Sequence, residues 1–188
     1  MDRLSEARLD LIHPRLAEVI RRQLAILQAE WFLSRGENLE IRICQGVRSW
    51  PEQASLYAKG RTMPGEPCRH AGAPRPVGTC PVHRLGLIVT RCRPGYSWHQ
   101  FGLAVDEVPD DPSLAGFQCD WNLAHPAWQR MKAVGESLGL VHGSEFRTFP
   151  DWPHFQLTGR FGVNPDDEVR QLFRDGGKQA VWEEARIE

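Results

Sequence analysis

The sequence lacks features that would each point to a different class of protein. It has no excess of positive charge, because 23 lysines and arginines against 24 aspartates and glutamates give a formal net charge of −1. That balance excludes the strongly basic surface of a typical nucleic-acid-binding domain. No apolar run approaches the roughly 18 residues that a membrane helix needs. Residues 1–16 alternate charged with apolar side chains and lack the continuous apolar core of a secretory signal. We therefore expect synthesis in the cytoplasm, no membrane span and no nucleic-acid partner.

Internal repeats and low-complexity segments are also missing. Hydrophobic residues make up 41% and charged residues 25% of 188 residues, which is the composition and length of one globular domain. We predict a single domain over residues 1–188, with an inserted loop at about residues 66–86, that acts as a monomer. Against this ordinary background, seven histidines and five cysteines stand out, because these side chains bind metals.

Hydrophobic spacing predicts an α+β domain with a small antiparallel sheet flanked by helices. Helices are predicted at residues 14–36, 49–60, 126–138 and 165–172. Strands are predicted at residues 39–43, 87–90, 101–108 and 153–157. Ser49 and Glu52 form a capping box at the start of the second helix. Arg48 is therefore expected on the loop between a strand and a helix.

Two fragments combine histidine with aspartate. In the first, His99 and Asp106 are seven residues apart, and Asp106 interrupts an apolar strand, where a carboxylate is costly unless it is paired or bound to a cation. In the second, Asp151 precedes His154 by three residues. Either fragment alone fits a structural histidine or a turn aspartate. Together they supply the two histidines and one aspartate of an open catalytic zinc site, plus a carboxylate that can act as general base.

Residues 97–106 carry the string Ser-x-His-x-x-Gly-x-Ala-x-Asp, which resembles the signature of the zinc-dependent D-Ala-D-Ala carboxypeptidase and L-alanyl-D-glutamate endopeptidase superfamily, peptidase family M15. The resemblance continues in residues 46–62 (Gly-Val-Arg-Ser to Gly-Arg-Thr) and in residues 151–156, and it extends over about residues 12–182. It implies the fold of that superfamily, shared with Hedgehog-like domains. In detail the blocks look closer to endolysin-like L-alanyl-D-glutamate endopeptidases than to dipeptidases.

The resemblance also implies roles for individual residues. It implies His99, Asp106 and His154 as ligands of one Zn²⁺, Asp151 as general base and acid, Arg48 as the oxyanion-stabilising donor, and Ser97 and Gln53 as substrate-binding or supporting residues. A surface ion pair is the alternative for Arg48. Trp98 and Trp152 each adjoin a motif residue and are expected to line the substrate cleft.

The predicted function is hydrolysis of an amide bond in peptidoglycan stem peptides by a zinc metallopeptidase. With no secretory signal, we expect the enzyme to reach the cell wall by lysis or a holin-like route, or to act on recycled fragments. One alternative is a non-catalytic peptide- or wall-binding domain on the same fold, because fold does not fix function. Another is a metal-dependent hydrolase of an amide outside the cell wall.

Residues 66–86 form an insertion that the family pattern does not contain. Three interpretations stay open: a disulfide between Cys68 and Cys80, a structural zinc site, or reduced thiols in a loop. A reducing compartment weighs against the disulfide. The zinc site would use Cys68, His70, Cys80 and His83. No partner at a recognisable spacing exists for Cys44, Cys92 and Cys119.

The other acidic residues and histidines are expected at the surface, in turns or at helix ends. The acids Glu107, Asp110 and Asp111 are predicted to form a solvated turn. Surface or helix-terminal positions are predicted for His13, His125 and His142.

Overall fold

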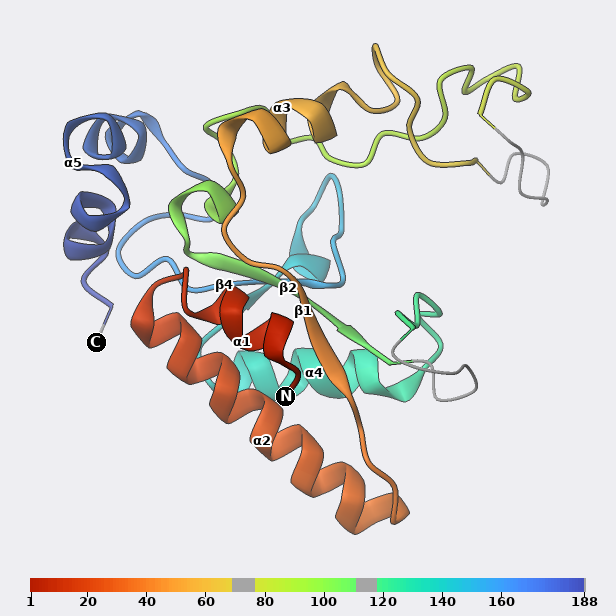
Figure 1. Ribbon diagram of the computed structural model, residues 1–188, viewed down its shortest axis with the longest axis vertical. Coiled ribbons are helices and arrows are strands. Elements are labelled where there is room, and N and C mark those ends of the chain that lie inside the picture. Colours follow the sequence, from red (N-terminus) through yellow and green to blue (C-terminus); the bar gives the residue numbers. More distant parts are fainter. Residues whose placement is uncertain (69–76, 111–117, 188) are drawn as a thin grey trace.

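The computed structural model of the protein describes residues 1–68, 77–110 and 118–187 (Figure 1). The helices are α1 (Arg3–Leu9), α2 (Pro14–Arg35), α3 (Trp50–Ala58), α4 (Pro126–Ser137) and α5 (Asp167–Ala185). The strands are β1 (Ile41–Gln45), β2 (Ala104–Pro109), β3 (Val141–His142) and β4 (His154–Gln156). Short 3-10 turns span Trp98–Phe101 and Gly143–Glu145. The predicted α+β class is confirmed.

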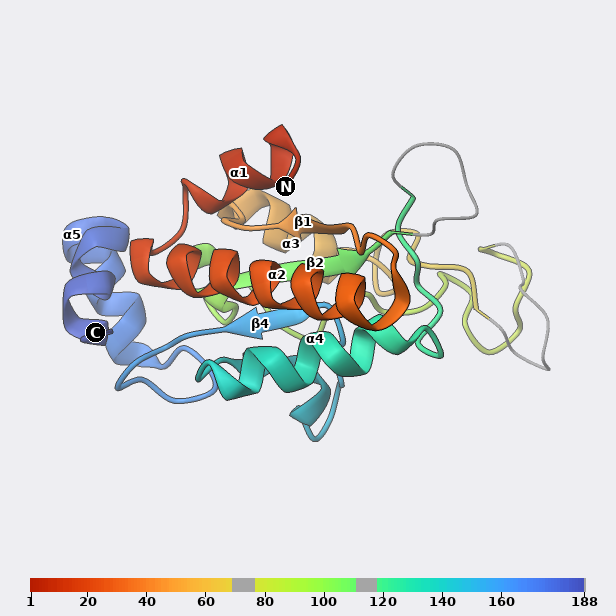
Figure 2. The ribbon, with the colours of Figure 1, turned by 90° about the horizontal axis from the view of Figure 1, so that it is seen from below.

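Within the described residues the strands form one antiparallel sheet in the order β1-β2-β4-β3. Side chains alternate between the two faces of a strand. Val105 pairs with Phe155, and both are fully buried in a core cluster that also holds Ile20 of α2 and Met131 of α4. Figure 2 shows α2 and α4 running alongside the sheet. The next pair along, Asp106 with His154, therefore faces away from this core.

Helix boundaries follow the signals in the sequence. The side chain of His13 caps α2 by accepting from the Arg15 N–H at 3.1 Å, and Gly36 ends the helix in the left-handed region at φ 70°. The predicted capping box is present, with Ser49 and Glu52 bonding each other's backbone N–H groups at the start of α3. The loop before α3 is thereby fixed.

A second cluster joins the 3-10 turn to α5. Trp98, Phe101 and Leu103 pack there against Val181. The predicted short last helix was wrong in extent, because α5 continues to Ala185 across non-helical backbone at Gly176 and Gly177. The residues after 172 therefore belong to a packed helix. Its Trp182 donates to the Phe101 carbonyl at 2.7 Å.

The predicted strand at 87–90 was wrong. Leu87 makes an isolated bridge to Glu66, and Leu87 and Ile88 are 38% and 39% exposed, so this apolar segment has no sheet to cover it. The predicted strand at 101–108 begins later, at Ala104. Gly102 ends the preceding 3-10 turn in the left-handed region at φ 69°.

The expected solvated turn was also wrong at Glu107, which lies in β2 with 0% exposure. Burial, with the charge of Asp106, raises the pKa of the Glu107 carboxyl to about 8. Asp110 accepts from the Gln118 N–H, whereas Asp111 lies outside the described residues. His142 was predicted at the surface or a helix end; it caps the 3-10 turn Gly143–Glu145 by accepting from the Ser144 N–H, and it is 1% exposed.

The thiols of Cys44 and Cys119 lie 3.6 Å apart, a pairing that sequence spacing did not indicate. Their segments meet because β1 runs beside β2 and the chain after β2 returns to it. In the described part of the chain no helix is long and apolar enough to span a membrane.

Gly135 of α4 marks a tight contact between helix and sheet. A Cβ at this position would lie 2.4 Å from the Phe155 ring. We predict that Gly135→Ala lowers the free energy of unfolding by about 1–2 kcal/mol, because overpacking outweighs the gain in helix propensity. Denaturant unfolding measures this. The exposed neighbour gives the control: Glu136→Ala should change stability by less than about 0.5 kcal/mol. Equal stability of the two variants would contradict the packing described.

Candidate metal centre

Three side chains converge on the sheet face that points away from the main core. His99 comes from the 3-10 turn, Asp106 from β2 and His154 from β4. Asp106 Oδ1 lies 3.1 Å from His99 Nε2 and 3.4 Å from His154 Nδ1. The two imidazole nitrogens are themselves 3.1 Å apart. The structure thus brings together the predicted ligand triad.

The hydrogen bond at Nδ1 of His99 fixes the tautomer of this imidazole. His99 Nδ1 lies 2.8 Å from the carbonyl oxygen of Gly46, which can only accept a hydrogen bond. Nδ1 therefore carries the proton, and the Nε2 lone pair points at Asp106 and His154. A carbonyl partner of this kind also orients a metal-binding imidazole.

Gln156 does the same for His154. Gln156 Nε2 donates to the Val163 carbonyl at 3.0 Å, which turns the amide oxygen towards His154. His154 Nε2 then donates to Gln156 Oε1 at 3.0 Å. The lone pair of His154 Nδ1 is left facing the other two ligand atoms. Sequence analysis did not single out Gln156, although its position two residues after His154 on a strand places both on one face.

The three facing atoms fit a zinc ion. Each presents a lone pair to the others, an arrangement that a cation relieves. Zn²⁺ at about 2.0–2.1 Å from tetrahedral nitrogen and oxygen ligands sets those ligands about 3.3 Å apart. The separations of 3.1–3.4 Å agree with that value. The chemistry and spacing of the donor set therefore suit a three-ligand zinc site.

Electrostatics favour the metal-binding state of Asp106 and His99, whereas the hydrogen bond and charge of Asp106 raise the pKa of His154 despite its burial. Burial would raise the pKa of the Asp106 carboxyl, but His99 and His154 hold it well below its usual range. Burial lowers the pKa of His99, which favours the neutral imidazole that binds metal. Both histidines are nearly inaccessible, at 2% and 6% exposure, so water competes weakly for the site.

Arg48 lies beside the triad. It donates to Asp106 Oδ2 at 3.3 Å, and its other terminal nitrogen donates to Gln53 Oε1 at 2.9 Å. Gln53 is held in turn, because its amide donates to the Cys92 carbonyl at 2.6 Å. The Arg48 side chain is 11% exposed, so it does not form the surface ion pair that was the alternative.

Asp151 lies in the loop before β4. Its N–H donates to the Gly143 carbonyl at 2.9 Å, and its own carbonyl accepts from the His154 N–H at 3.2 Å. His142 donates from Nε2 to the neighbouring Trp152 carbonyl at 2.8 Å, which explains its burial. Burial and the charge of Asp106 raise the pKa of the Asp151 carboxyl to about 6.

The remaining predicted residues lie at different depths. Ser97 is 6% exposed and begins the 3-10 turn. Trp98 is 2% exposed and donates to the Val163 carbonyl at 2.8 Å, so it packs in the second cluster instead of lining an open cleft. Trp152 is half-buried at the edge of the main core.

Comparisons with known proteins show what the segment around this centre is similar to. Residues 91–157 match the M15 family model described as D-alanyl-D-alanine carboxypeptidase, a segment that contains the triad and Asp151. The peptidoglycan L-alanyl-D-glutamate endopeptidase CwlK of Bacillus subtilis is 27% identical over 125 residues, which are 64% of this chain and 62% of that protein. The match thus spans less than two thirds of that relative's length.

A solved structure, the L-Ala D-Glu endopeptidase ChiX of Serratia marcescens, aligns with 24% identity over 92% of this chain and 90% of that chain, with a TM-score of 0.46. The fold and site define an α+β domain with a His-Asp-His centre. The family-model match and the curated relative confirm the resemblance to the M15 peptidase family.

Gln156 offers a test of the metal centre. We predict that Gln156→Ala weakens zinc binding about 10–100-fold, because His154 loses the acceptor that fixes its tautomer. Competition with a chromophoric chelator measures the affinity. Gln171→Ala, on the exposed face of α5, is the control and should bind zinc like the parent protein. Unchanged affinity in the Gln156 variant would refute the role given to this side chain.

Proposed function

We propose that this chain is a zinc peptidase that hydrolyses an amide bond in peptidoglycan stem peptides. The observation that carries the proposal is the triad His99, Asp106 and His154, whose ligand atoms lie 3.1–3.4 Å apart with Arg48 bonded to the aspartate. Support comes from the family match over residues 91–157, which contains the triad.

The triad would hold Zn²⁺, which polarises a carbonyl and lowers the pKa of water to about 7. Asp151 would accept a proton from the attacking water at its carboxylate and deliver it to the leaving nitrogen. Its raised pKa, about 6, suits a group that must both take and give a proton near neutral pH. The buried triad and the loop at Asp151 restrict access of bulk water.

Arg48 would stabilise the negative charge that develops on the scissile carbonyl oxygen. Its guanidinium is fixed before substrate arrives, through Gln53 and Asp106 Oδ2. Its Nε is buried and has no hydrogen-bond partner among the described residues. A pre-oriented cationic donor in a poorly hydrated site contributes about 3–4 kcal/mol to transition-state stabilisation.

Among the M15 specificities we favour the L-alanyl-D-glutamate bond, because the curated relative carries that activity in its name. Incubation with purified peptidoglycan should release peptides with a new N-terminal D-glutamate, detected by mass spectrometry. Release of free D-alanine would identify a carboxypeptidase instead. A digest with zinc-loaded protein that shows neither product would reject the cell-wall substrate and favour a binding domain or a different amide.

A variant at Asp151 tests catalysis separately from metal binding. We predict that Asp151→Ala keeps the zinc content of the parent protein and lowers turnover by on the order of 10²–10⁴-fold, because proton transfer is lost. Metal analysis and peptide hydrolysis are measured on the same sample. Asp175→Ala on α5 is the matched control, since that exposed carboxylate accepts from Gln171 on the same helix. A fully active Asp151 variant would disprove the general-base role.

A further inference from the structure

The insertion predicted at residues 66–86 makes its own small unit. Gly65 N–H donates to the Leu85 carbonyl at 2.6 Å. Glu66 and Leu87 exchange backbone hydrogen bonds at 3.2 and 2.7 Å, which closes the base of the excursion. Figure 1 shows this part of the chain projecting from the sheet and helices. The two sides of the excursion thus meet without help from either core cluster.

Burial in this unit is inverted relative to an ordinary domain. The apolar side chains of Val82, Leu85 and Leu87 are 62%, 38% and 38% exposed. Cys68 and Cys80, by contrast, are each 2% exposed. A unit this small that exposes its apolar side chains needs a cross-link or a metal to hold it together.

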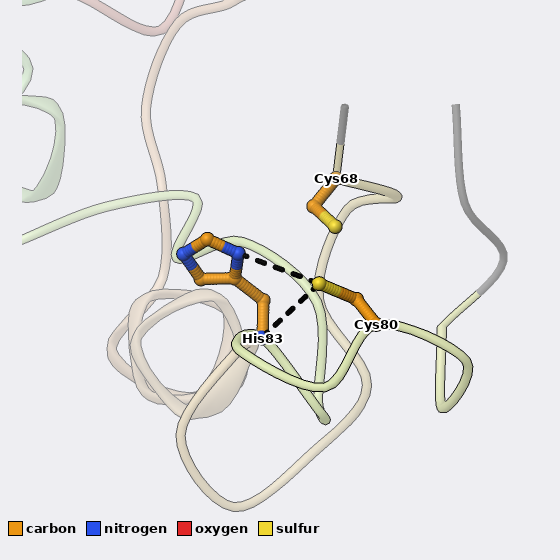
Figure 3. Close-up of side chains that lie close together, drawn as sticks. All are labelled: Cys68, Cys80 and His83. Atoms are coloured by element: carbon orange, nitrogen blue, oxygen red, sulfur yellow. Dashed lines mark hydrogen bonds between the residues drawn. The ribbon is translucent and has the colours of Figure 1, made fainter. Parts of the chain in front are cut away.

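The buried cysteines face a histidine. Cys80 Sγ lies 3.8 Å from His83 Nδ1, and the His83 N–H donates to the same sulfur at 3.4 Å (Figure 3). The ligand atoms of Cys68, Cys80 and His83 all lie within 4.8 Å of one another. Figure 3 shows the Cys68 sulfur directed towards Cys80.

We propose that Cys68, Cys80 and His83 bind a second zinc ion, separate from the His-Asp-His centre. Two sulfurs and one imidazole nitrogen are ligands that Zn²⁺ prefers in structural sites. With Zn–S near 2.3 Å and Zn–N near 2.0–2.1 Å, a tetrahedron sets sulfur and nitrogen about 3.5–3.6 Å apart. The Cys80–His83 separation of 3.8 Å is close to that value. His70, the other candidate from the sequence, lies outside the described residues, so three residues define the site.

The surroundings of Cys80 favour a thiolate. The Cys80 sulfur accepts a hydrogen bond from the backbone N–H of His83 at 3.4 Å. N–H donation to sulfur stabilises a metal-bound thiolate. Because metal binding requires deprotonated sulfur, this backbone turn lowers the cost of forming the site.

His83 distinguishes zinc from the alternative disulfide. A disulfide needs only the two sulfurs, at about 2.05 Å, and gives the imidazole no role. The structure has Cys68 and Cys80 as free thiols, with the His83 ring against the Cys80 sulfur. The ring position and the N–H···S bond are what a zinc ligand set requires.

Metal analysis of the full chain, prepared with reductant, tests the proposal. Parent protein should hold two zinc ions, and Cys80→Ser and His83→Ala should each hold one. Cobalt substitution adds an independent readout, because thiolate–cobalt charge transfer absorbs in the near ultraviolet only when sulfur binds the metal. His154→Ala should lose one ion and keep this absorption. Cys119→Ala, which removes a thiol elsewhere, should keep both ions and the absorption.

Each contrary result overturns the proposal. Parent protein that shows no thiolate–cobalt absorption would exclude a sulfur site, whatever the state of the other centre. A His83 variant that keeps both ions would show that the imidazole is not a ligand. An intact mass of unreduced parent protein two hydrogens lower, with the loss mapped to Cys68 and Cys80 and no second zinc after reduction, would assign a disulfide.

Discussion

The antiparallel pairing of β2 with β4 is the constraint on which the site depends. One residue pair of these strands, Val105 with Phe155, is buried in the main core. The next pair, Asp106 with His154, faces the other side of the sheet. A slip of one residue would exchange these faces and bury two ligands in hydrocarbon. The hydrophobic core thus enforces the register that brings a carboxylate and an imidazole to 3.4 Å.

Each of the three ligand residues has a hydrogen-bond partner that fixes both its protonation state and its orientation. Gly46 contributes a carbonyl to His99, and Gln156, itself bound to the Val163 carbonyl, contributes an acceptor to His154. Arg48 occupies the second oxygen of Asp106. The partners come from segments far apart in the chain, so the electronic state of the triad depends on the completed fold. A buried polar group left without such a partner would cost about 1–3 kcal/mol.

The sequence allowed prediction of the parts of this design that depend on local signals. The capping box at Ser49 and the spacing of His99 and Asp106 needed only neighbouring residues, and the structure contains both. Burial of Glu107 depends on which strands meet, and single-residue chemistry argued for exposure of this carboxylate. The segment at 87–90 has strand-like composition but no strand beside it, and pairing decides that outcome.

A chain of contacts connects the insertion to Arg48, beside the candidate metal centre. The polypeptide leaves the base at Leu87 and reaches Cys92, whose carbonyl accepts from Gln53, and Gln53 in turn holds Arg48. The net charge of −1 gives little long-range attraction for an anionic polymer, so under the proposed function selectivity would come from residues held close to the site. Arg48, which contacts both Gln53 and Asp106, is one such residue.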